Sequence, residues 1–89
     1  MFTPNPDVVC RELEGEAVLL HLGSGVYFGL NAVGTRIWQL IAAGHAPAAI
    51  VDVLAQEYDA DRATIAADVD ALIAALEAKQ LIVGADAAT

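Results

Sequence analysis

The stretch "GVYFGLNAVGTRIW", residues 25–38, changes from a strand pattern to a helix pattern at a single corner. Its first half alternates between two faces, with Val26, Phe28 and Leu30 on one and Tyr27 and Gly29 on the other. Asn31 follows directly and is a strong helix N-cap, because its side-chain oxygen can accept a hydrogen bond from a free amide of the first turn. The apolar stripe at helical spacing after it comprises Val33, Ile37, Leu40 and Ile41. The sequence therefore predicts a strand over 26–30 that runs straight into a helix.

Two further strands are predicted upstream of this corner, over residues 7–13 and 17–22. Gly15 marks a tight turn between them, and the GSG segment at 23–25 marks the turn into the strand 26–30. Connections this short favour a three-stranded antiparallel meander. Residues 1–6, which include two prolines, are expected to form an irregular lead-in.

Two more helices are predicted downstream. Gly44 is expected to end the first helix as a C-cap, and Pro47 fits the first turn of the second. Asp61 can cap a third helix, and Lys79 lies where a cation favours the helix dipole. Gly34, inside the first helix, costs about 1 kcal/mol relative to alanine, and a close approach of another backbone is the expected compensation.

Three strands followed by three helices make an α+β arrangement. Two short helices, a longer third one and an adjacent sheet describe a winged-helix-turn-helix-like fold, in which one sheet face must pack on the helices. We expect a single domain over residues 1–89 with an ordered core of about 7–83. Residues 81–83 are expected to add a short extended piece, and 84–89 to form a frayed tail.

The charge of the chain argues against several classes of partner. The net charge is −8, from four basic and twelve acidic residues. Four scattered cations cannot build a basic patch, so we expect neither nucleic acid nor an anionic membrane surface as a partner. A single cysteine allows no intrachain disulfide and fits a reducing compartment. With no secretory signal and no run near the roughly 20 apolar residues that span a bilayer, a cytoplasmic protein is expected.

No group of residues in the sequence predicts catalysis. His21 and His45 lack further ligands at the spacing that a zinc site requires. Cys10 lacks the neighbouring base and orienting partner of a nucleophile, which favours a packing role. We therefore expect a protein with no catalytic residues, no metal site and no cofactor.

The strand over 26–30 has a free edge unless a helix covers it. Free edges are usually protected by charges or proline, and this strand carries neither. A peptide that adds as a further strand would satisfy the main-chain groups of the edge, while side pockets select its sequence. Two alternatives remain open: the third helix closes over the edge, or the edge pairs in a homodimer.

Two segments, "YFGLNAVGTRIWQLI" and "IVDVLAQEYDADRATIAADVDALIAALEAKQLIV", together resemble the PqqD-like family of peptide-recognition elements in ribosomal peptide natural-product pathways. The resemblance spans residues 17–83. It rests on the order and spacing of Leu30-Asn31, Gly34, Ile37-Trp38, Asp68-Val69, Leu72, Leu76 and Leu81. It implies a non-catalytic domain that binds the leader segment of a precursor peptide as an added strand and presents it to a modifying enzyme or leader peptidase.

Carried over residue by residue, the resemblance implies a peptide site formed by the third strand and the outer side of the third helix. Its expected residues are Val26, Tyr27, Phe28, Gly29, Asp68, Ala71, Leu72 and Ala75. Tyr27 and the main chain of 26–29 are expected to contact the peptide, whereas Phe28 and Leu30 are expected in the core. Alanines on the helix would leave room for peptide side chains above a floor formed by Leu72.

The form of the first segment is more similar to discrete recognition proteins of lasso-peptide pathways than to the subunit of pyrroloquinoline quinone (PQQ) synthesis, which stands as an alternative. One departure is Ala46, where the family often has a capping Ser or Thr. A winged-helix DNA-binding regulator is a further alternative, but Asp61, Asp68 and Asp70 on its recognition helix would repel phosphates. The acidic balance of the chain predicts a leader that is neutral or basic near its contact region.

Overall fold

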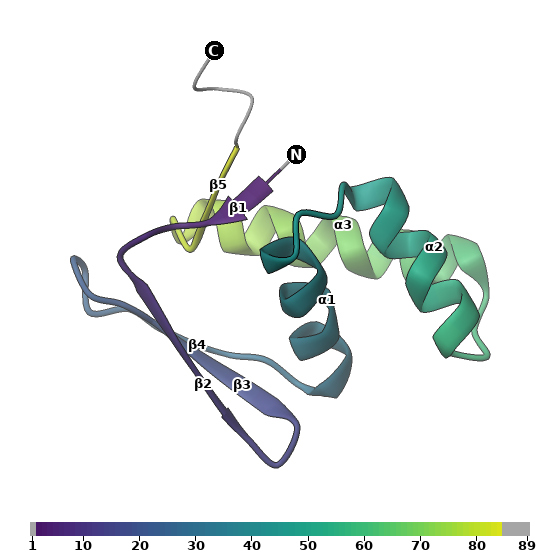
Figure 1. Cartoon of the computed structure of the whole chain (residues 1–89). Helices are drawn as coiled ribbons and strands as arrows, with labels where there is room; N and C mark the ends of the chain where they lie inside the picture. The colour runs from purple at the N-terminus through teal and green to yellow at the C-terminus, as the bar shows by residue number, and fades with distance from the viewer. Residues whose placement is uncertain (1, 85–89) are drawn as a thin grey trace.

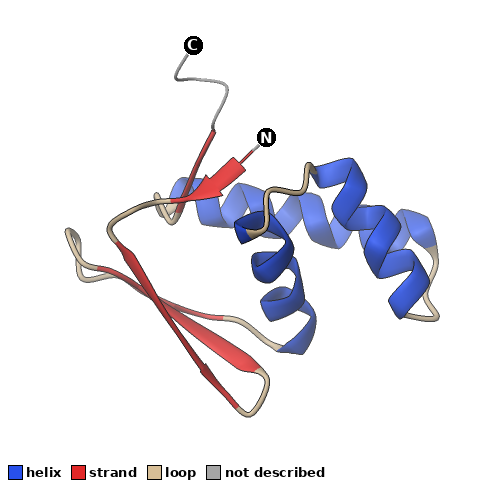
Figure 2. Cartoon of the chain, viewed as in Figure 1, coloured by secondary structure: helices blue, strands red, loops and turns tan. Residues whose placement is uncertain are grey.

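The computed structural model describes residues 2–84, whose elements Figure 1 labels in chain order. These are β1 (Phe2–Pro4), β2 (Val8–Leu13), β3 (Glu16–His21), β4 (Tyr27–Gly29), α1 (Ala32–Ala42), α2 (Pro47–Glu57), α3 (Arg62–Ala78) and β5 (Ile82–Gly84). Strands β2, β3 and β4 form an antiparallel meander in that order, and three helices follow it. The meander stands beside the helices, and α1 is the helix that packs on it (Figure 2). The predicted α+β, winged-helix-like fold is confirmed.

The N-terminal segment is a strand, so the expectation of an irregular lead-in over residues 1–6 is wrong. Strand β1 pairs antiparallel with β5 in a second, two-stranded sheet. Asn5 secures this pairing, because its main-chain N–H donates to Leu81 O (3.0 Å) and its side-chain amide donates to Gln80 O (2.8 Å). Strand β5 confirms the extended piece expected near 81–83, but it spans Ile82–Gly84, so Gly84 belongs to a strand and not to the expected frayed tail. From residue 85 on, the expected frayed tail lies outside the described residues.

The corner between β4 and α1 is built from its own side chains. Asn31 caps α1 as predicted: its Oδ1 accepts from Gly34 N–H at 2.8 Å. A Cβ added at Gly34 would lie 3.3 Å from Asn31 Oδ1 and 3.3 Å from Leu30 Cδ2. The close contact at Gly34 is therefore made with the side chains of the corner, and the expected approach of another backbone is wrong.

A buried threonine hydroxyl joins the two strands at this corner. Leu30 N–H donates to Ala17 O (2.8 Å), as in an ordinary ladder, but Ala17 N–H donates to Thr35 Oγ1 (2.8 Å) instead of to Leu30. The hydroxyl in turn donates to Leu30 O at 3.4 Å. Thr35 thus replaces one rung of the ladder and lets β4 leave β3 without an unsatisfied amide.

Replacing Thr35 with valine is expected to lower the free energy of unfolding by about 1–3 kcal/mol, the cost of a buried donor left unsatisfied. Valine keeps the volume of the side chain but leaves Ala17 N–H without an acceptor. Urea denaturation measures the change, and Thr35→Ser, which keeps the hydroxyl, is the matched control. If Thr35→Val is as stable as the wild type, the bridging role is wrong.

Helices α1 and α3 end with the same backbone motif, in which the residue after the cap has positive φ. That residue is Gly44 (φ 93°) after α1 and Gln80 (φ 59°) after α3, and the caps are Ala43 and Lys79. The paired bonds of a Schellman motif follow in both, as His45 N–H to Leu40 O and Leu81 N–H to Leu76 O. Asp61 occupies the N-cap position of α3, as predicted, but its side chain makes no capping hydrogen bond.

The sheet packs on the helices through the face of β3 that carries Ala17, Leu19 and His21, all buried, whereas Val18 is exposed. His21 is 7% exposed, and Ser24 N–H donates to its Nδ1 at 3.1 Å, which closes the turn before β4. The largest fully buried side chains are Leu19, Ile37, Ile41, Ile50, Leu54, Val69, Leu76 and Leu81. The core thus joins β3 to all three helices and to Leu81, which directly precedes β5.

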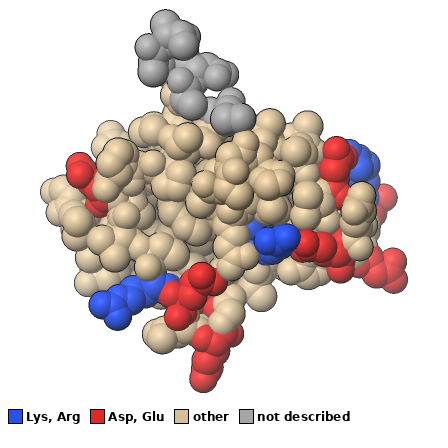
Figure 3. Space-filling model, in the orientation of Figure 1, with Lys and Arg blue, Asp and Glu red and all other residues tan. Residues whose placement is uncertain are grey.

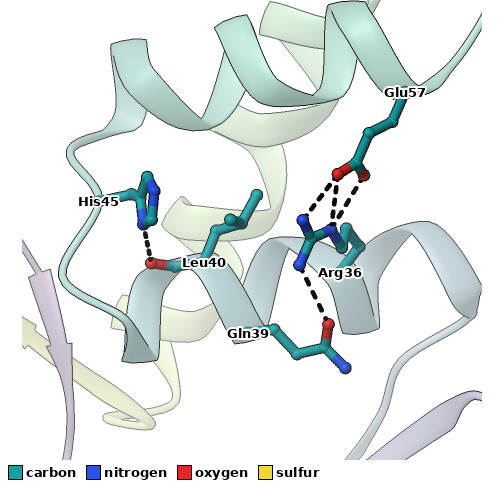
Figure 4. Close-up of polar contacts among 5 residues, drawn as sticks. All are labelled: Arg36, Gln39, Leu40, His45 and Glu57. Atoms are coloured by element: carbon teal, nitrogen blue, oxygen red, sulfur yellow. Dashed lines mark hydrogen bonds and ion pairs between the residues drawn. The ribbon is translucent and has the colours of Figure 1, made fainter.

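On the face drawn in Figure 3, charged side chains lie over the β2–β3 turn, near the α2–α3 connection, and in a blue and red group nearer the middle. One of the ion pairs joins α1 to the end of α2 (Figure 4): Arg36 Nη2 lies 2.6 Å and Nε 2.9 Å from the Glu57 carboxylate. The hydrogen bond from Arg36 lowers the pKa of Glu57 and raises that of Arg36 itself. Because both side chains are partly exposed to solvent, the pair is expected to contribute little to stability.

Candidate functional site

Strand β4 is an edge strand whose outward main chain has no partner. Two hydrogen bonds flank its pairing with β3, from His21 N–H to Val26 O (2.9 Å) and from Leu30 N–H to Ala17 O (2.8 Å). Since residues of antiparallel strands alternate between paired and unpaired positions, the N–H and C=O groups of Tyr27 and Gly29 point away from β3. Within residues 2–84, these groups make no hydrogen bond to another element. The predicted free edge is present.

The side chains of β4 divide between the two faces of the sheet. Tyr27 is 70% exposed on the outer face, and a Cβ at Gly29 would meet nothing within 4 Å. Leu30 is buried, as expected for a core residue. Phe28 is only partly buried, packing against the core with Lys79 Nζ at 5.9 Å from its ring centroid. The inner face of the strand therefore borders solvent at Phe28.

A hollow of about 390 Å³ lies beside this edge. Its walls are Phe28, Gly29 and Leu30 of the β4 segment, Asn31, Val33, Gly34 and Ile37 at the start of α1, and Asp68 and Leu72 of α3. Helix α3 thus forms the wall opposite β4. The alternative in which the third helix closes over the edge is wrong.

A second hollow of about 120 Å³ continues from the first, because Val33, Ile37 and Asp68 line both. It extends toward the α2–α3 connection and is otherwise lined by Leu54, Tyr58, Ala60, Thr64 and Ile65. Most of these side chains are apolar. Together the two hollows, called here the groove, form an apolar depression that leads from the β4 edge along α3.

Four of the eight residues predicted for the site line the groove: Phe28, Gly29, Asp68 and Leu72. Val26 and Tyr27 belong to the same edge segment but not to the lining, and Ala71 and Ala75 lie on α3 outside it. The prediction missed the start of α1, above all Val33 and Gly34. Their position directly after the edge strand was the available signal, since a helix that begins at the end of β4 must flank its edge.

The other candidate residues have structural surroundings. Partial burial and then the Glu12 carboxylate raise the pKa of the Cys10 thiol, which disfavours the nucleophilic thiolate. No cluster of three or more His, Cys, Asp or Glu side chains able to hold a metal occurs between residues 2 and 84. In that same part of the chain, no helix has the length and apolar character needed to cross a bilayer.

A winged-helix-like domain with an open strand edge and an adjoining apolar groove defines a class suited to taking up an extended peptide. Residues 16–82 match the family described as Coenzyme PQQ synthesis protein D (PqqD), and the chain belongs to this family. The predicted PqqD-like membership is confirmed. No curated protein matches the chain significantly.

Two solved structures are similar over nearly the whole chain. The structure of TbiB1 in complex with the TbiA(beta) leader peptide superposes with a TM-score of 0.87 at 44% identity, covering 92% of this chain and 95% of that one. Lasso peptide synthetase B1 complexed with the leader peptide superposes with a TM-score of 0.85 at 29% identity, covering 93% and 98%. Both relatives are thus leader-peptide complexes, and one is named as part of a lasso peptide synthetase, in line with the predicted lasso-pathway type.

Proposed function

We propose that this protein binds the leader region of a ribosomally synthesised precursor peptide as an added strand on β4. It catalyses no reaction itself and presents the peptide, in the cytoplasm, to a modifying enzyme or leader peptidase. The observation that carries this function is the unpartnered main chain of Tyr27 and Gly29 beside the groove. The leader-peptide complexes of two relatives, one of them 44% identical, support it.

The edge offers a short but complete set of main-chain groups. Tyr27 and Gly29 each present one donor and one acceptor, so an added strand gains up to four hydrogen bonds, each contributing about 0.5–1.5 kcal/mol net. Alternate side chains of the peptide then point to opposite faces of the enlarged sheet. Those on the same face as Phe28 enter the groove, where Leu72 and Ile37 offer apolar contact. The backbone supplies affinity, and the groove selects the sequence.

The subunit of PQQ synthesis remains a second candidate, because the matching family model carries that description. It would use the same edge for a different precursor. The free edge also permits a homodimer, which would compete with the peptide for the same groups. The net charge of −8 makes duplex DNA an unfavourable partner. Tight binding to DNA at physiological salt, or a tight dimer without peptide affinity, would contradict the proposal.

Amide hydrogen exchange tests the proposal at single residues. In the free protein, the amides of Tyr27 and Gly29 are expected to exchange fast, whereas that of Leu30, bonded to Ala17 O, exchanges slowly. Saturation with the TbiA(beta) leader peptide is expected to slow the first two at least about tenfold, the effect of a hydrogen bond near 1.4 kcal/mol. NMR exchange rates give the result. Protection elsewhere on the surface, with none at Tyr27 and Gly29, would place the peptide at another site.

A further inference from the structure

Asp68 lies where the two hollows of the groove adjoin. It lines both hollows, and it is the only charged side chain in the lining of either. Its neighbours there include Val33, Ile37 and Leu72, which are apolar. The Asp68 carboxylate therefore lies where the two hollows meet.

This carboxylate has no counterion among residues 2–84. Arg36 pairs with Glu57, Arg62 pairs with Asp52, and the Lys79 ammonium lies over the ring of Phe28. No hydrogen bond to the Asp68 side chain is formed within that part of the chain either. In the free protein, Asp68 is exposed and water solvates its charge.

A peptide that covers the groove removes part of that water. Taking a charge out of water is costly unless a partner of opposite charge or a hydrogen-bond donor replaces the lost solvation. An uncharged apolar peptide would therefore pay a desolvation cost at Asp68. A lysine or arginine side chain would remove the cost and add a charge-assisted hydrogen bond.

We propose that Asp68 is a specificity-determining residue that selects a lysine or arginine side chain of the bound peptide. The inference rests on the proposed function and names one chemical feature of the peptide. The cation is expected on the peptide face that points into the groove, next to an apolar side chain that fills one of the hollows. The acidic character of the whole chain would attract the same peptides, but only Asp68 would fix the position of the charge.

Selection from a library of random twelve-residue peptides tests this inference. The wild type is expected to enrich Lys or Arg at one fixed position, beside an enriched apolar position. Asp68→Asn is expected to lose the basic preference and keep the apolar one, and Asp68→Lys to select Asp or Glu instead. Asp70→Asn is the matched control, because it removes the same charge two residues away, where Asp70 lines a different hollow with Pro47 and Arg62.

A selected peptide and its Lys→Ala analogue then give the magnitude by fluorescence anisotropy. The wild type and Asp70→Asn are expected to prefer the lysine peptide about tenfold, the equivalent of a charge-assisted hydrogen bond near 1.4 kcal/mol. Asp68→Asn is expected to bind both peptides equally. An equal loss in Asp68→Asn and Asp70→Asn would show that overall charge, not position, is read, and would overturn the inference.

A wrong role for Asp68 and a wrong proposed function give different experimental results. Peptides selected without any basic position would overturn the role of Asp68 and leave strand addition intact. A wild type that selects no peptide, or a folded edge variant that selects the same peptides as the wild type, would overturn the proposed function itself. Thermal unfolding of each variant confirms that the comparison is made between folded proteins.

Discussion

Replacing Tyr27 with proline is expected to weaken binding of the leader peptide more than about tenfold while the domain remains folded. Proline removes one outward donor, a loss of about 1 kcal/mol, and its ring occupies the place of the incoming strand's acceptor. The ladder to β3 is unaffected, because the flanking hydrogen bonds belong to Val26 and Leu30 and the Tyr27 N–H points outward. The variant thus blocks the edge without removing a bond of the fold.

Fluorescence anisotropy with a labelled TbiA(beta) leader peptide measures the loss, and circular dichroism confirms the fold. Tyr27→Ala is the matched control: it keeps the N–H and removes only a side chain on the outer face, so its binding is expected to stay within a few fold of the wild type. Phe28→Pro, opposite Leu19 in the ladder, is expected to disrupt the strand itself. A folded Tyr27→Pro protein that binds as tightly as the wild type would remove the peptide from this edge.

Leu81→Ala is expected to lower the free energy of unfolding by about 2–5 kcal/mol, the range for truncating a buried leucine. Leu81 is 0% exposed and directly follows the positive-φ residue Gln80 at the end of α3. Its main-chain carbonyl also accepts from Asn5, so its side chain anchors the point where α3, β5 and the N-terminal segment meet. Against a typical domain stability of about 5–15 kcal/mol, this is a large fraction.

Val83→Ala is the matched control for this change, since Val83 lies two residues after Leu81, within β5, and is 42% exposed. Its expected cost is below about 1 kcal/mol, in keeping with partial exposure. Urea denaturation gives both values. Because Leu81 lines neither hollow, the folded fraction of Leu81→Ala should bind peptide normally. Equal stabilities of the two variants would show that the β1–β5 region adds little to the core.

Features set by neighbouring residues could be predicted from the sequence. The strand-to-helix corner follows from the alternation before Leu30 and from the cap at Asn31. The helix stripes follow from their spacing, except that Val33 of the α1 stripe is 36% exposed. Strand β1 could not be predicted, because its partner lies at the far end of the chain. Which face of β3 is buried could not be predicted either, because both faces carry apolar residues. In the structure the face with His21 is buried, and Ser24 N–H donates to the imidazole there.

The candidate site could likewise be predicted from the sequence only in part. The free edge follows from the residues of β4, and the helical spacing of four places Asp68 and Leu72 on one side of α3. Ala71 and Ala75 form a neighbouring stripe that the groove does not reach. The position of α1 directly after β4 indicates that this helix flanks the edge, but which of its residues line the groove, Val33 and Gly34 among them, depends on the angle at which α1 leaves β4.

The pairing of β1 with β5 places Phe2 opposite Gly84. The first and last described residues of the chain therefore lie side by side. Neither strand contributes to the groove walls. A domain with that geometry can be inserted into a loop of a larger protein, or linked to an enzyme through either end, without obstructing the groove.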